Sequence, residues 1–483
     1  MSAPLNIDFY KSGHKAQYPN GIEVVFSNFT PRASRIKEAN SIVFFGLQYY
    51  IKKYLVEEWN RDFFSKPKEE VVGAYKHLMD MALGVGKVNT EHIARLHDLG
   101  YLPLTIMALP EGSRVPIGVP PFVMFNTHHD AAWLPNYLET ILSCTIWQAC
   151  TSATIADLYR QEFKRAADLS SSCPDFSAWQ GHDFSMRGMS SLETAMLSGA
   201  GHLLSFQGTD TVPAIGFLSK YYGYNWKTPI GSVPASEHSV MCAGTEDGEL
   251  ETFRRLMSIY PTGVLSVVSD TWDYWGVLTN ILPQLKEEIM KRDGKLVIRP
   301  DSSIKTPLEI ICGDPEAPVG SPENLGSIRL LYNLFGGTKN SKGFIELDSH
   351  IGLIYGDSIT RDLARNINNK LMEMGFASTN WVAGIGSYTY QYNTRDTFGF
   401  AMKATACQIN GEMREIYKSP KTDSGTKKSA KGLLAVYEEN GTFRLKQQAT
   451  WHDVFNCAFL EVFHDGVEYN TQSFEGIRKV LNP

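Results

Sequence analysis

The sequence predicts an α/β fold built around a closed barrel of parallel strands, and three observations predict it. Short apolar runs recur through the middle of the chain with helix-sized spacers between them. A polar tip follows each run, as Arg299-Pro300-Asp301 follows 296–298. Repeated strand-then-helix units imply parallel strands joined by crossover helices. Because at least five such tips occur, a barrel, whose strand ends all converge on one mouth, fits better than an open sheet.

The composition is that of a large globular chain. Of the 483 residues, 43% are hydrophobic and 20% are charged, and the formal net charge is -6. Since this length exceeds that of an ordinary single domain, we expect two domains. One is the barrel over 151–403, and the other is a discontinuous mixed α/β domain formed by 1–150 plus 404–483. The negative charge does not favour a nucleic-acid partner.

Several classes of protein are disfavoured by what the sequence lacks. No apolar run approaches the length of a bilayer span, and the start has no signal-peptide stretch. The seven cysteines form no C-x-x-C pair, and an odd number without framework spacing predicts reduced thiols and a cytoplasmic location. Zincin and P-loop motifs are absent from the sequence.

The elements of the first third are predicted from periodicity and turn residues. A weakly alternating run predicts a strand at 22–29, and amphipathic patterns predict helices at 42–54 and 69–83. Runs broken by Pro and Gly predict short strands at 104–109, 114–117 and 121–126. A long helical region, expected as two helices, follows at 131–166.

The barrel strands are the apolar runs that end in polar tips, and they are 203–206, 264–268, 296–298, 351–355 and 381–383. Spacers such as 274–291 and 360–374 have helical periodicity. After Lys403 the chain returns to β-like segments at 433–438, 442–446 and 467–471, which we expect to pack on the N-terminal strands. The stretch 419–432, rich in Lys, Ser and Gly, predicts a mobile basic loop.

The tips carry side chains suited to anions and hydroxyl groups. Arg299 and Asp301 set an anion binder beside a hydroxyl binder. Asp210 follows a tight turn and could accept hydrogen bonds from an amide or a sugar, although alone it is better explained as a helix N-cap. His238 could be a nucleophile or a proton carrier, with Glu237 orienting it, or an ordinary loop histidine.

Further tips suit phosphate and a flat heterocycle. The run 384–387, Gly-Ile-Gly-Ser, leaves backbone NH groups unobstructed, which suits phosphate. Phe184 lies three residues before Arg187, so a stacking ring accompanies an anion holder. Asp273, three residues after Asp270, could share a cation with it or only satisfy a helix dipole. The stretch 128–130, His-His-Asp, could bind a metal but is better explained as a loop entering a helix.

Each of these signals has a structural explanation when it is taken alone, but together they describe one mouth. Its bases are Arg187, Arg299, Arg395 and Lys403, and its acids are Asp210, Asp273, Asp301 and Asp357. Bases for phosphate and acids for ribose hydroxyls predict a phosphosugar or nucleotide site.

At these same residues the sequence resembles the nicotinamide phosphoribosyltransferase family. The matching stretches are 8–11, 182–188, 208–211, 232–238, 266–270, 298–302, 356–357 and 473–479, which span nearly the whole chain. The resemblance implies an irregular α/β barrel, an added mixed domain and a homodimer with active sites at the interface. It also implies transfer of phosphoribose from phosphoribosyl pyrophosphate to nicotinamide, with Mg²⁺ on the pyrophosphate and ATP as a co-substrate that phosphorylates His238.

The resemblance assigns the remaining roles residue by residue. Phe184 and Tyr10 would sandwich the pyridine ring, with Tyr10 coming from the second subunit. Asp210 would accept from the carboxamide, Arg299 would hold the carboxamide side, and Asp301 would hold the ribose. The other substrate-binding residues would be Gly356, Asp357 and Gly386 around the ribose and its 5′-phosphate, Arg187 by the phosphates, and Ser269 and Asp273. Across the dimer, pyrophosphate would be held by Arg32, Arg395, Lys403 and Lys418. Ser303, Ser387 and Ala401 depart from the family's pattern on the phosphate side.

Three other functions compete with this interpretation. A nicotinate phosphoribosyltransferase is disfavoured because an ionised Asp210 would repel the substrate carboxylate. A non-catalytic binding protein is disfavoured because the set of His238, Arg299, Asp301 and Asp357 is intact. A barrel aldolase or glycosidase would need a catalytic lysine or two facing carboxylates at the mouth, and the aldolase is weakened because Lys295 is expected to precede its strand.

Overall fold

The computed structural model describes residues 3–301, 305–356, 359–417 and 430–482, which form two compact units. The first comprises the described residues of Met1–Thr154, Ile215–Asn225 and Asn393–Pro483, and the second those of Ile155–Ala214 and Trp226–Tyr392. The boundaries therefore lie at 154 and 392, where the sequence predicts 150 and 403. Residues 215–225 were not anticipated in the first unit, because they continue a helix that begins in the second, α8 (Val212–Tyr222).

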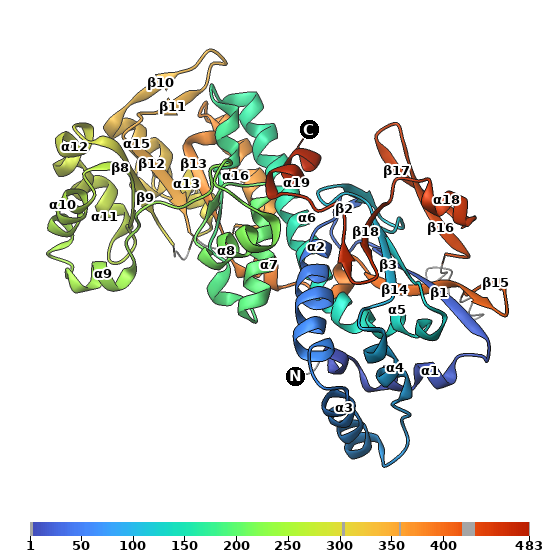
Figure 1. Cartoon of the computed structure of the whole chain (residues 1–483). Coiled ribbons are helices and arrows are strands. Elements are labelled where there is room, and N and C mark those ends of the chain that lie inside the picture. Colours follow the sequence, from blue (N-terminus) through green and yellow to red (C-terminus); the bar gives the residue numbers. More distant parts are fainter. Residues whose placement is uncertain (1–2, 302–304, 357–358, 418–429, 483) are drawn as a thin grey trace. The chain divides into compact units, whose positions relative to one another are not determined.

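The first unit is built on an antiparallel sheet whose strands come from both ends of the chain (Figure 1). Among the described residues the strand order is β15 (Glu412–Glu415), β14 (Ala401–Ile409), β1 (Ile22–Thr30), β5 (Phe122–Asn126), β3 (Leu104–Ala108), β18 (Leu460–His464) and β19 (Val467–Glu468). Phe29 on β1 stacks on Phe122 of β5 at 5.3 Å between ring centroids, and on Phe400 at 5.2 Å. The pairing of β1 with β14 confirms the predicted discontinuous second domain.

The helix predicted at 42–54 begins later than expected. Residues Ser41–Val43 form β2, which pairs with β4 (Arg114–Pro116), and α2 starts only at Leu47 (Leu47–Tyr50) before π-type turns at Ile51–Glu58. The buried Glu111 carboxylate accepts from the backbone N of Gly46 at 3.1 Å and of Gln48 at 2.6 Å, so it holds the helix start from outside. Burial raises the pKa of Glu111 to about 7, although these backbone hydrogen bonds act in the opposite direction.

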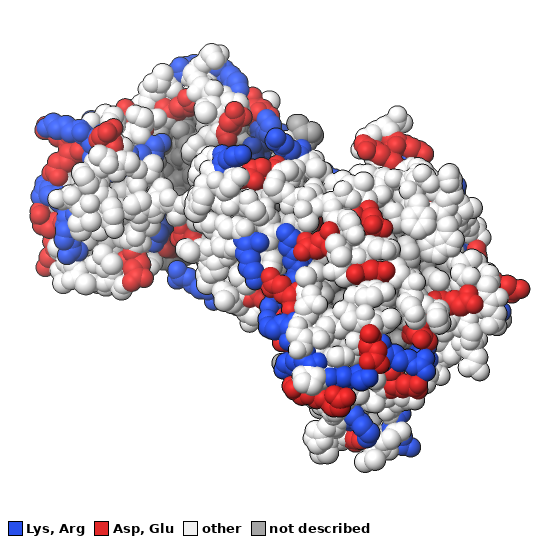
Figure 2. Space-filling model, in the orientation of Figure 1, with Lys and Arg blue, Asp and Glu red and all other residues white. Residues whose placement is uncertain are grey.

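The other elements of the first unit are α1 (His14–Gln17), α3 (Lys68–Leu83), α4 (Glu91–Leu99), α5 (Leu134–Tyr137), the first half of α6 (Glu139–Ser170), the hairpin of β16 (Leu433–Glu439) and β17 (Thr442–Ala449), α18 (Trp451–Phe455) and α19 (Phe474–Leu481). They include the helix predicted at 69–83, the helical region predicted at 131–166 and the strands predicted at 433–438 and 442–446, whereas α1, α4, α18 and α19 were not predicted. No helix among the described residues combines the length and apolarity that a membrane span needs. Acidic and basic side chains are interspersed on the face shown in Figure 2.

The second unit contains the predicted parallel barrel. Its described strands run in the order β7 (Gly208–Thr209), β6 (Gly181–Asp183), β13 (Trp381–Ile385), β12 (Ile351–Tyr355), β9 (Asp293–Arg299) and β8 (Thr262–Val268). All five pairings are parallel. Two parallel bridges, Gly208 to Gly231 and Ala235 to Ser266, join the two edge strands through the extended segment 231–235. This segment closes an irregular barrel, which confirms the predicted fold class.

Two barrel strands differ from the prediction. Residues 203–206 are not a strand. Leu203 is the last residue of α7 (Leu192–Leu203), which begins at a capping box at Ser191, and 204–206 form the turn that leaves it. The apolar residues of this run are buried at the helix end and in the turn, and the strand is the shorter β7 that follows. Sequence reasoning missed β6, because His182 and Asp183 give it no apolar run.

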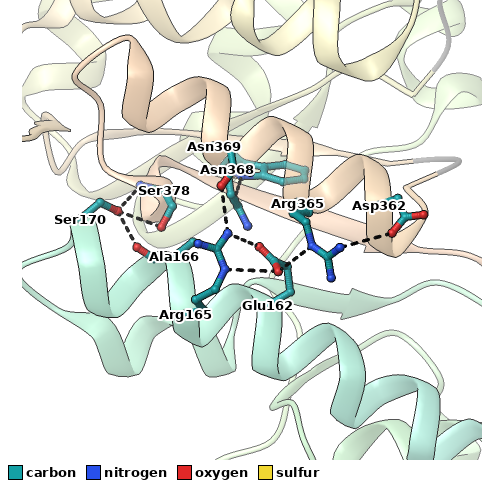
Figure 3. A network of polar contacts seen from close by, with 10 residues as sticks. Glu162, Arg165, Ala166, Ser170, Asp362, Arg365, Asn368, Asn369 and Ser378 are labelled. Atoms are coloured by element: carbon teal, nitrogen blue, oxygen red, sulfur yellow. Dashed lines mark hydrogen bonds and ion pairs between the residues drawn. The ribbon is translucent and has the colours of Figure 1, made fainter. Parts of the chain in front are cut away.

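Helices surround this barrel, and buried polar groups tie them to each other. The described ones are α9 (His238–Ala243), α10 (Glu249–Ile259), α11 (Tyr274–Gly276), α12 (Leu282–Met290), α13 (Pro307–Cys312), α14 (Pro322–Leu325), α15 (Ser327–Phe335), α16 (Arg361–Glu373) and α17 (Ser387–Gln391), with the hairpin of β10 (Gly337–Lys339) and β11 (Ile345–Leu347). Glu162 on α6 accepts from Arg165 at 2.6 Å and from Arg365 on α16 at 3.1 Å (Figure 3). Because Arg165 is also on α6, the contact of Glu162 with Arg365 is the one that joins the two helices.

Candidate active site

A cavity of about 440 Å³ lies inside the barrel of the second unit. His182, Phe184, Asp210, Ser232 and Arg299 line it at the carboxyl ends of the strands, and Trp179, Lys295 and Trp381 line it toward their starts. This volume falls within the range of small-molecule sites, roughly 300–1,000 Å³. Lys295 lies within β9 and not before it, so the expected position of this lysine was wrong.

Asp210 presents an anion to the cavity. Its Oδ1 accepts from Ser232 Oγ at 2.5 Å and lies 2.9 Å from His182 Nε2. Burial raises the pKa of Asp210, but the hydrogen bonds of His182 and Ser232, together with the charge of Arg299, outweigh it and leave the pKa below its usual value. The Asp210 carboxylate is therefore ionised and lines a cavity. A residue that served only as a helix N-cap would not explain this position.

Phe184 follows β6 and lies beside His182, with 4.7 Å between ring centroids. Its backbone N donates to Ile385 O at 3.0 Å, which joins it to the tip of β13. A Cβ at Gly384 would lie 2.8 Å from Phe184 Cδ2 and 2.8 Å from Gly356 O. Gly384 is thus required for the position of the aromatic ring, a role that the sequence pattern, interpreted as a phosphate loop, did not indicate.

Arg299 and Asp301 end β9 as predicted, and neighbouring strand tips fix both. Arg299 Nη2 donates to Ser236 O at 2.8 Å, and Arg299 Nε lies 3.3 Å from Asp301 Oδ1. A Cβ at Gly356 would lie 1.8 Å from Asp301 Oδ1, so the tip of β12 must carry glycine there. Ser269 is fully buried, and its Oγ donates to Val267 O at 2.8 Å, which places it behind Arg299.

His238 begins α9 and is held by an acid that sequence reasoning did not pair with it. His238 Nε2 lies 3.1 Å from Asp270 Oδ1, while Asp270 Oδ2 accepts from Asp301 N at 2.9 Å. The side chain of His238 is 47% exposed and that of Asp270 only 3%. Glu237, the expected orienting group, accepts from Ser239 instead. The position of Asp270 at the end of a predicted strand was the signal from which this pairing with His238 could have been predicted.

The other predicted residues of this unit lie around the mouth. Arg187 is exposed on the short turn Met186–Gly188, and a Cβ at Gly188 would lie 2.0 Å from Ser387 Oγ, so this turn abuts the loop after Gly386. Asp273 precedes α11 and is exposed. Glu249 is buried near it, and burial followed by the charge of Asp273 raises the pKa of Glu249 to about 7. Asp357 and Ser303 lie outside the described residues.

The remaining candidates belong to the first unit. Tyr10 is exposed, and its ring centroid lies 5.2 Å from that of His14. Arg32 Nε donates to Gly399 O at 2.9 Å. Arg395 Nη2 lies 3.7 Å from Asp396 Oδ1, and Lys403 is exposed on β14. Ala401, a departure from the family's pattern, is buried at the start of β14. Lys418 and most of 419–432 lie outside the described residues.

One group of potential metal ligands converges among the described residues. The ligand atoms of His128, His129 and Asp130 in the first unit lie within 4.8 Å of one another. Asp130 Oδ2 already accepts from Arg95 Nη1 at 3.3 Å, and Asp130 N donates to His128 Nδ1 at 3.3 Å. These contacts agree with the structural alternative, a loop that enters a helix.

The second unit is a parallel barrel whose mouth brings together an aromatic ring, Phe184, an arginine, Arg299, and the acids Asp210 and Asp301. Solved structures share the fold at 13% identity and a TM-score of 0.56. They are nicotinate-nucleotide pyrophosphorylase from Pyrococcus furiosus, with 99% of this chain and 94% of that chain covered, and human nicotinic acid phosphoribosyltransferase, with 98% and 92% covered.

The sequence comparisons identify the family. The model of the nicotinate phosphoribosyltransferase (NAPRTase) family matches 179–461, and the nicotinamide phosphoribosyltransferase N-terminal domain matches 2–76. The chain belongs to the nicotinate phosphoribosyltransferase family. A nicotinamide phosphoribosyltransferase of Acinetobacter baylyi is 50% identical over 99% of this chain and 97% of its own, and one of Mycoplasma pneumoniae is 35% identical over 90% and 96%. The resemblance noted from the motifs is thereby confirmed.

Proposed function

We propose that this chain is a nicotinamide phosphoribosyltransferase. The ring nitrogen of nicotinamide attacks C1 of phosphoribosyl pyrophosphate, the bond from C1 to the pyrophosphate oxygen breaks, and nicotinamide mononucleotide and pyrophosphate are released. The observation that carries the proposal is the ionised Asp210 carboxylate in the cavity beside Phe184 and Arg299. The relatives named for this activity support it.

The cavity explains a preference for the amide over the acid. A carboxamide NH2 donates to the Asp210 carboxylate, whereas the carboxylate of nicotinate would face a like charge. Phe184 offers a ring face for the pyridine, and Arg299 offers NH donors to the carboxamide oxygen. Tyr10 is proposed to cover the other ring face from a second copy of the chain.

The tips of β9 and β12 serve the ribose. Asp301 accepts from ribose hydroxyls, and Gly356 leaves room for this carboxylate. Departure of pyrophosphate leaves positive charge on the sugar, as in other glycosyl chemistry. Catalysis then rests on holding the nucleophile in place and on cations around the leaving group. Arg187 is one proposed cation, and the others, Arg32, Arg395, Lys403 and Lys418, are proposed to come from a second copy of the chain. Gly386, Asp357, Ser269 and Asp273 complete the proposed site.

We further propose that ATP phosphorylates His238. The imidazole would attack the γ-phosphorus, so that a P–N bond forms, the P–O bond to ADP breaks, and water later releases phosphate. The exposure of His238 and its contact with the buried Asp270 support this, because a carboxylate fixes the tautomer and orientation of an imidazole. Carboxylates at the mouth suit Mg²⁺, which would neutralise phosphate charge on the substrates.

A homodimer and a cytoplasmic location complete the proposal. The free state of all seven cysteines supports a reducing compartment. Nicotinate transfer and non-catalytic binding are the alternatives, and Asp210 disfavours the first.

The deciding experiment measures pyrophosphate release from phosphoribosyl pyrophosphate with nicotinamide or nicotinate, with and without ATP. Release with nicotinamide, raised by ATP, is expected. His238→Ala should remove only the ATP-dependent increase. A preference for nicotinate would overturn the role of Asp210, and no release with either pyridine would favour the binding protein.

A further inference from the structure

We infer that Asp183 is a positioning residue of the pyridine site, which holds Phe184 and Asp210 in place from the far side of the barrel wall. Its neighbours His182 and Phe184 line the cavity, whereas Asp183 is fully buried, at 0% exposure, and does not line it. Successive side chains of a strand point to opposite faces, so Asp183 faces away from the cavity. The inference rests on the proposed roles of Phe184 and Asp210.

One carboxylate oxygen of Asp183 fixes the loop after β6. Oδ1 accepts from Ser185 N at 2.9 Å and from Ser185 Oγ at 2.6 Å. A side chain that bonds the backbone two residues later closes a local turn, and Phe184 is the residue enclosed by it. Because Phe184 N is also bonded to Ile385 O, its backbone is held on both sides.

The other oxygen fixes the tip after β7. Oδ2 accepts from Thr209 Oγ1 at 3.1 Å, and that oxygen accepts in turn from Thr211 N at 2.9 Å. The backbone O of Asp183 accepts from Asp210 N at 2.9 Å. Asp183 therefore holds Thr209 directly and Thr211 through the Thr209 hydroxyl. Asp210 lies between these two residues, and its own backbone N donates a hydrogen bond to Asp183 O.

The surroundings of Asp183 leave this carboxyl group little other function. Within the described part of the chain its hydrogen-bond donors are neutral, and the titratable neighbour His202, on which its charge acts, is kept neutral because burial lowers the pKa of His202 to about 4. A Cβ at Gly199 of α7 would lie 3.3 Å from Asp183 Oδ2, so the helix approaches the carboxyl group closely. Burying a carboxyl group is unfavourable unless hydrogen bonds satisfy it, and here these hydrogen bonds all lead to the two substrate-binding tips.

The test compares kcat and KM for nicotinamide and nicotinate in the full-length protein. Asp183→Ala should raise KM for nicotinamide at least tenfold and lower the nicotinamide-to-nicotinate ratio of kcat/KM at least tenfold. Asp183→Asn keeps an oxygen that can accept from Ser185, and it should restore the ratio to within about threefold of wild type. Thr209→Val breaks only the second link and should lower the ratio severalfold, even where Asp183→Ala does not fold.

Ser170→Ala is the matched control, because Ser170 is an equally buried polar residue of the same unit. Its Oγ donates to Ala166 O at 2.8 Å and contacts Ser378 Oγ at 3.0 Å on the outer side of the barrel (Figure 3). It should lower Tm without changing the substrate ratio. An unchanged ratio in both Asp183→Ala and Thr209→Val, or an equal change in Ser170→Ala, would overturn the inference. Asp210→Ala distinguishes the role inferred for Asp183 from the role proposed for Asp210. If this variant keeps the wild-type preference for nicotinamide over nicotinate, the role of Asp210 itself is refuted.

Discussion

Replacement of Asp210 by asparagine removes the charge that is proposed to exclude nicotinate, while the shape of the side chain is kept. In the variant the Asn NH2 can donate to Ser232 Oγ, whose hydroxyl donates to Asp210 Oδ1 at 2.5 Å in wild type, and the Asn oxygen is then left to accept from the carboxamide. Nicotinamide therefore keeps a hydrogen-bond partner but loses a charge-assisted one. Nicotinate loses a repulsion that wild type imposes on its carboxylate.

The size of the effect follows from the surroundings of Asp210. Two unit charges about 4 Å apart repel by roughly 4 kcal/mol at an effective dielectric of about 20. The Asp210 side chain is 44% exposed, and Arg299 lies nearby, so we reduce this to about 1–2 kcal/mol for nicotinate. The weaker hydrogen bond takes about 1 kcal/mol from nicotinamide. The ratio of kcat/KM should shift toward nicotinate by about 2–3 kcal/mol, or roughly 30- to 150-fold.

The assay measures kcat/KM for both pyridines at saturating phosphoribosyl pyrophosphate and constant ionic strength. Wild type and Asp210→Asn are compared with Glu162→Gln, which changes a buried carboxylate on the outer side of the same unit. A ratio in Asp210→Asn that stays within threefold of wild type would refute the electrostatic account. An equal change in both variants would show a general loss of folding.

Three further predictions concern the glycine that faces Phe184 and two buried acids. Gly384→Ala places a Cβ 2.8 Å from Phe184 Cδ2, and it should raise KM for nicotinamide about tenfold, roughly 1.4 kcal/mol, in steady-state kinetics; an unchanged KM would contradict this. Because burial raises the pKa of Glu111 to about 7, its protonated form is favoured in the folded state, so this stabilisation is present below the unfolded pKa and is lost as pH rises through 7. Relative to Glu111→Gln, wild type should lose about 3 kcal/mol of unfolding free energy between pH 4 and 8, to order of magnitude, and a parallel pH dependence in denaturant titrations would contradict it. Glu162→Gln leaves Arg165 and Arg365 without their shared carboxylate. It should lower the unfolding free energy by about 1–2 kcal/mol, because both arginines are partly exposed, and it should leave the nicotinamide-to-nicotinate ratio of kcat/KM unchanged.

Local sequence was sufficient to place two of the proposed site residues at the end of a strand. Arg299 and Asp301 follow β9, and their chemistry can be deduced because a buried parallel strand must place its next residues at the mouth. The same rule led to Asp210, although the strand before it was expected at 203–206 and is β7. His238 was singled out in a loop, and the partners of both residues remained unknown. The discontinuous first unit was also predictable, since β-like segments return after the barrel.

Elements without a periodic signal could not be predicted. β6 has three residues and includes a histidine and an aspartate, so it carries no apolar run, yet it positions Phe184. Residues 203–206 misled for the opposite reason, because an apolar run fits the buried end of a helix as well as a strand. Only the packed structure separates these two possibilities.

The sequence by itself determined the class of fold, the family and the residue types at the mouth, because strand periodicity and strand ends are local properties of the chain. The tertiary structure decided which tips are neighbours. Segment 231–235 closes the ring, Asp270 holds His238 across 32 residues, and Asp183 links the tips of β6 and β7 across 26 residues. Such contacts depend on strand order and register, which arise from packing between distant segments and leave no mark in the local sequence.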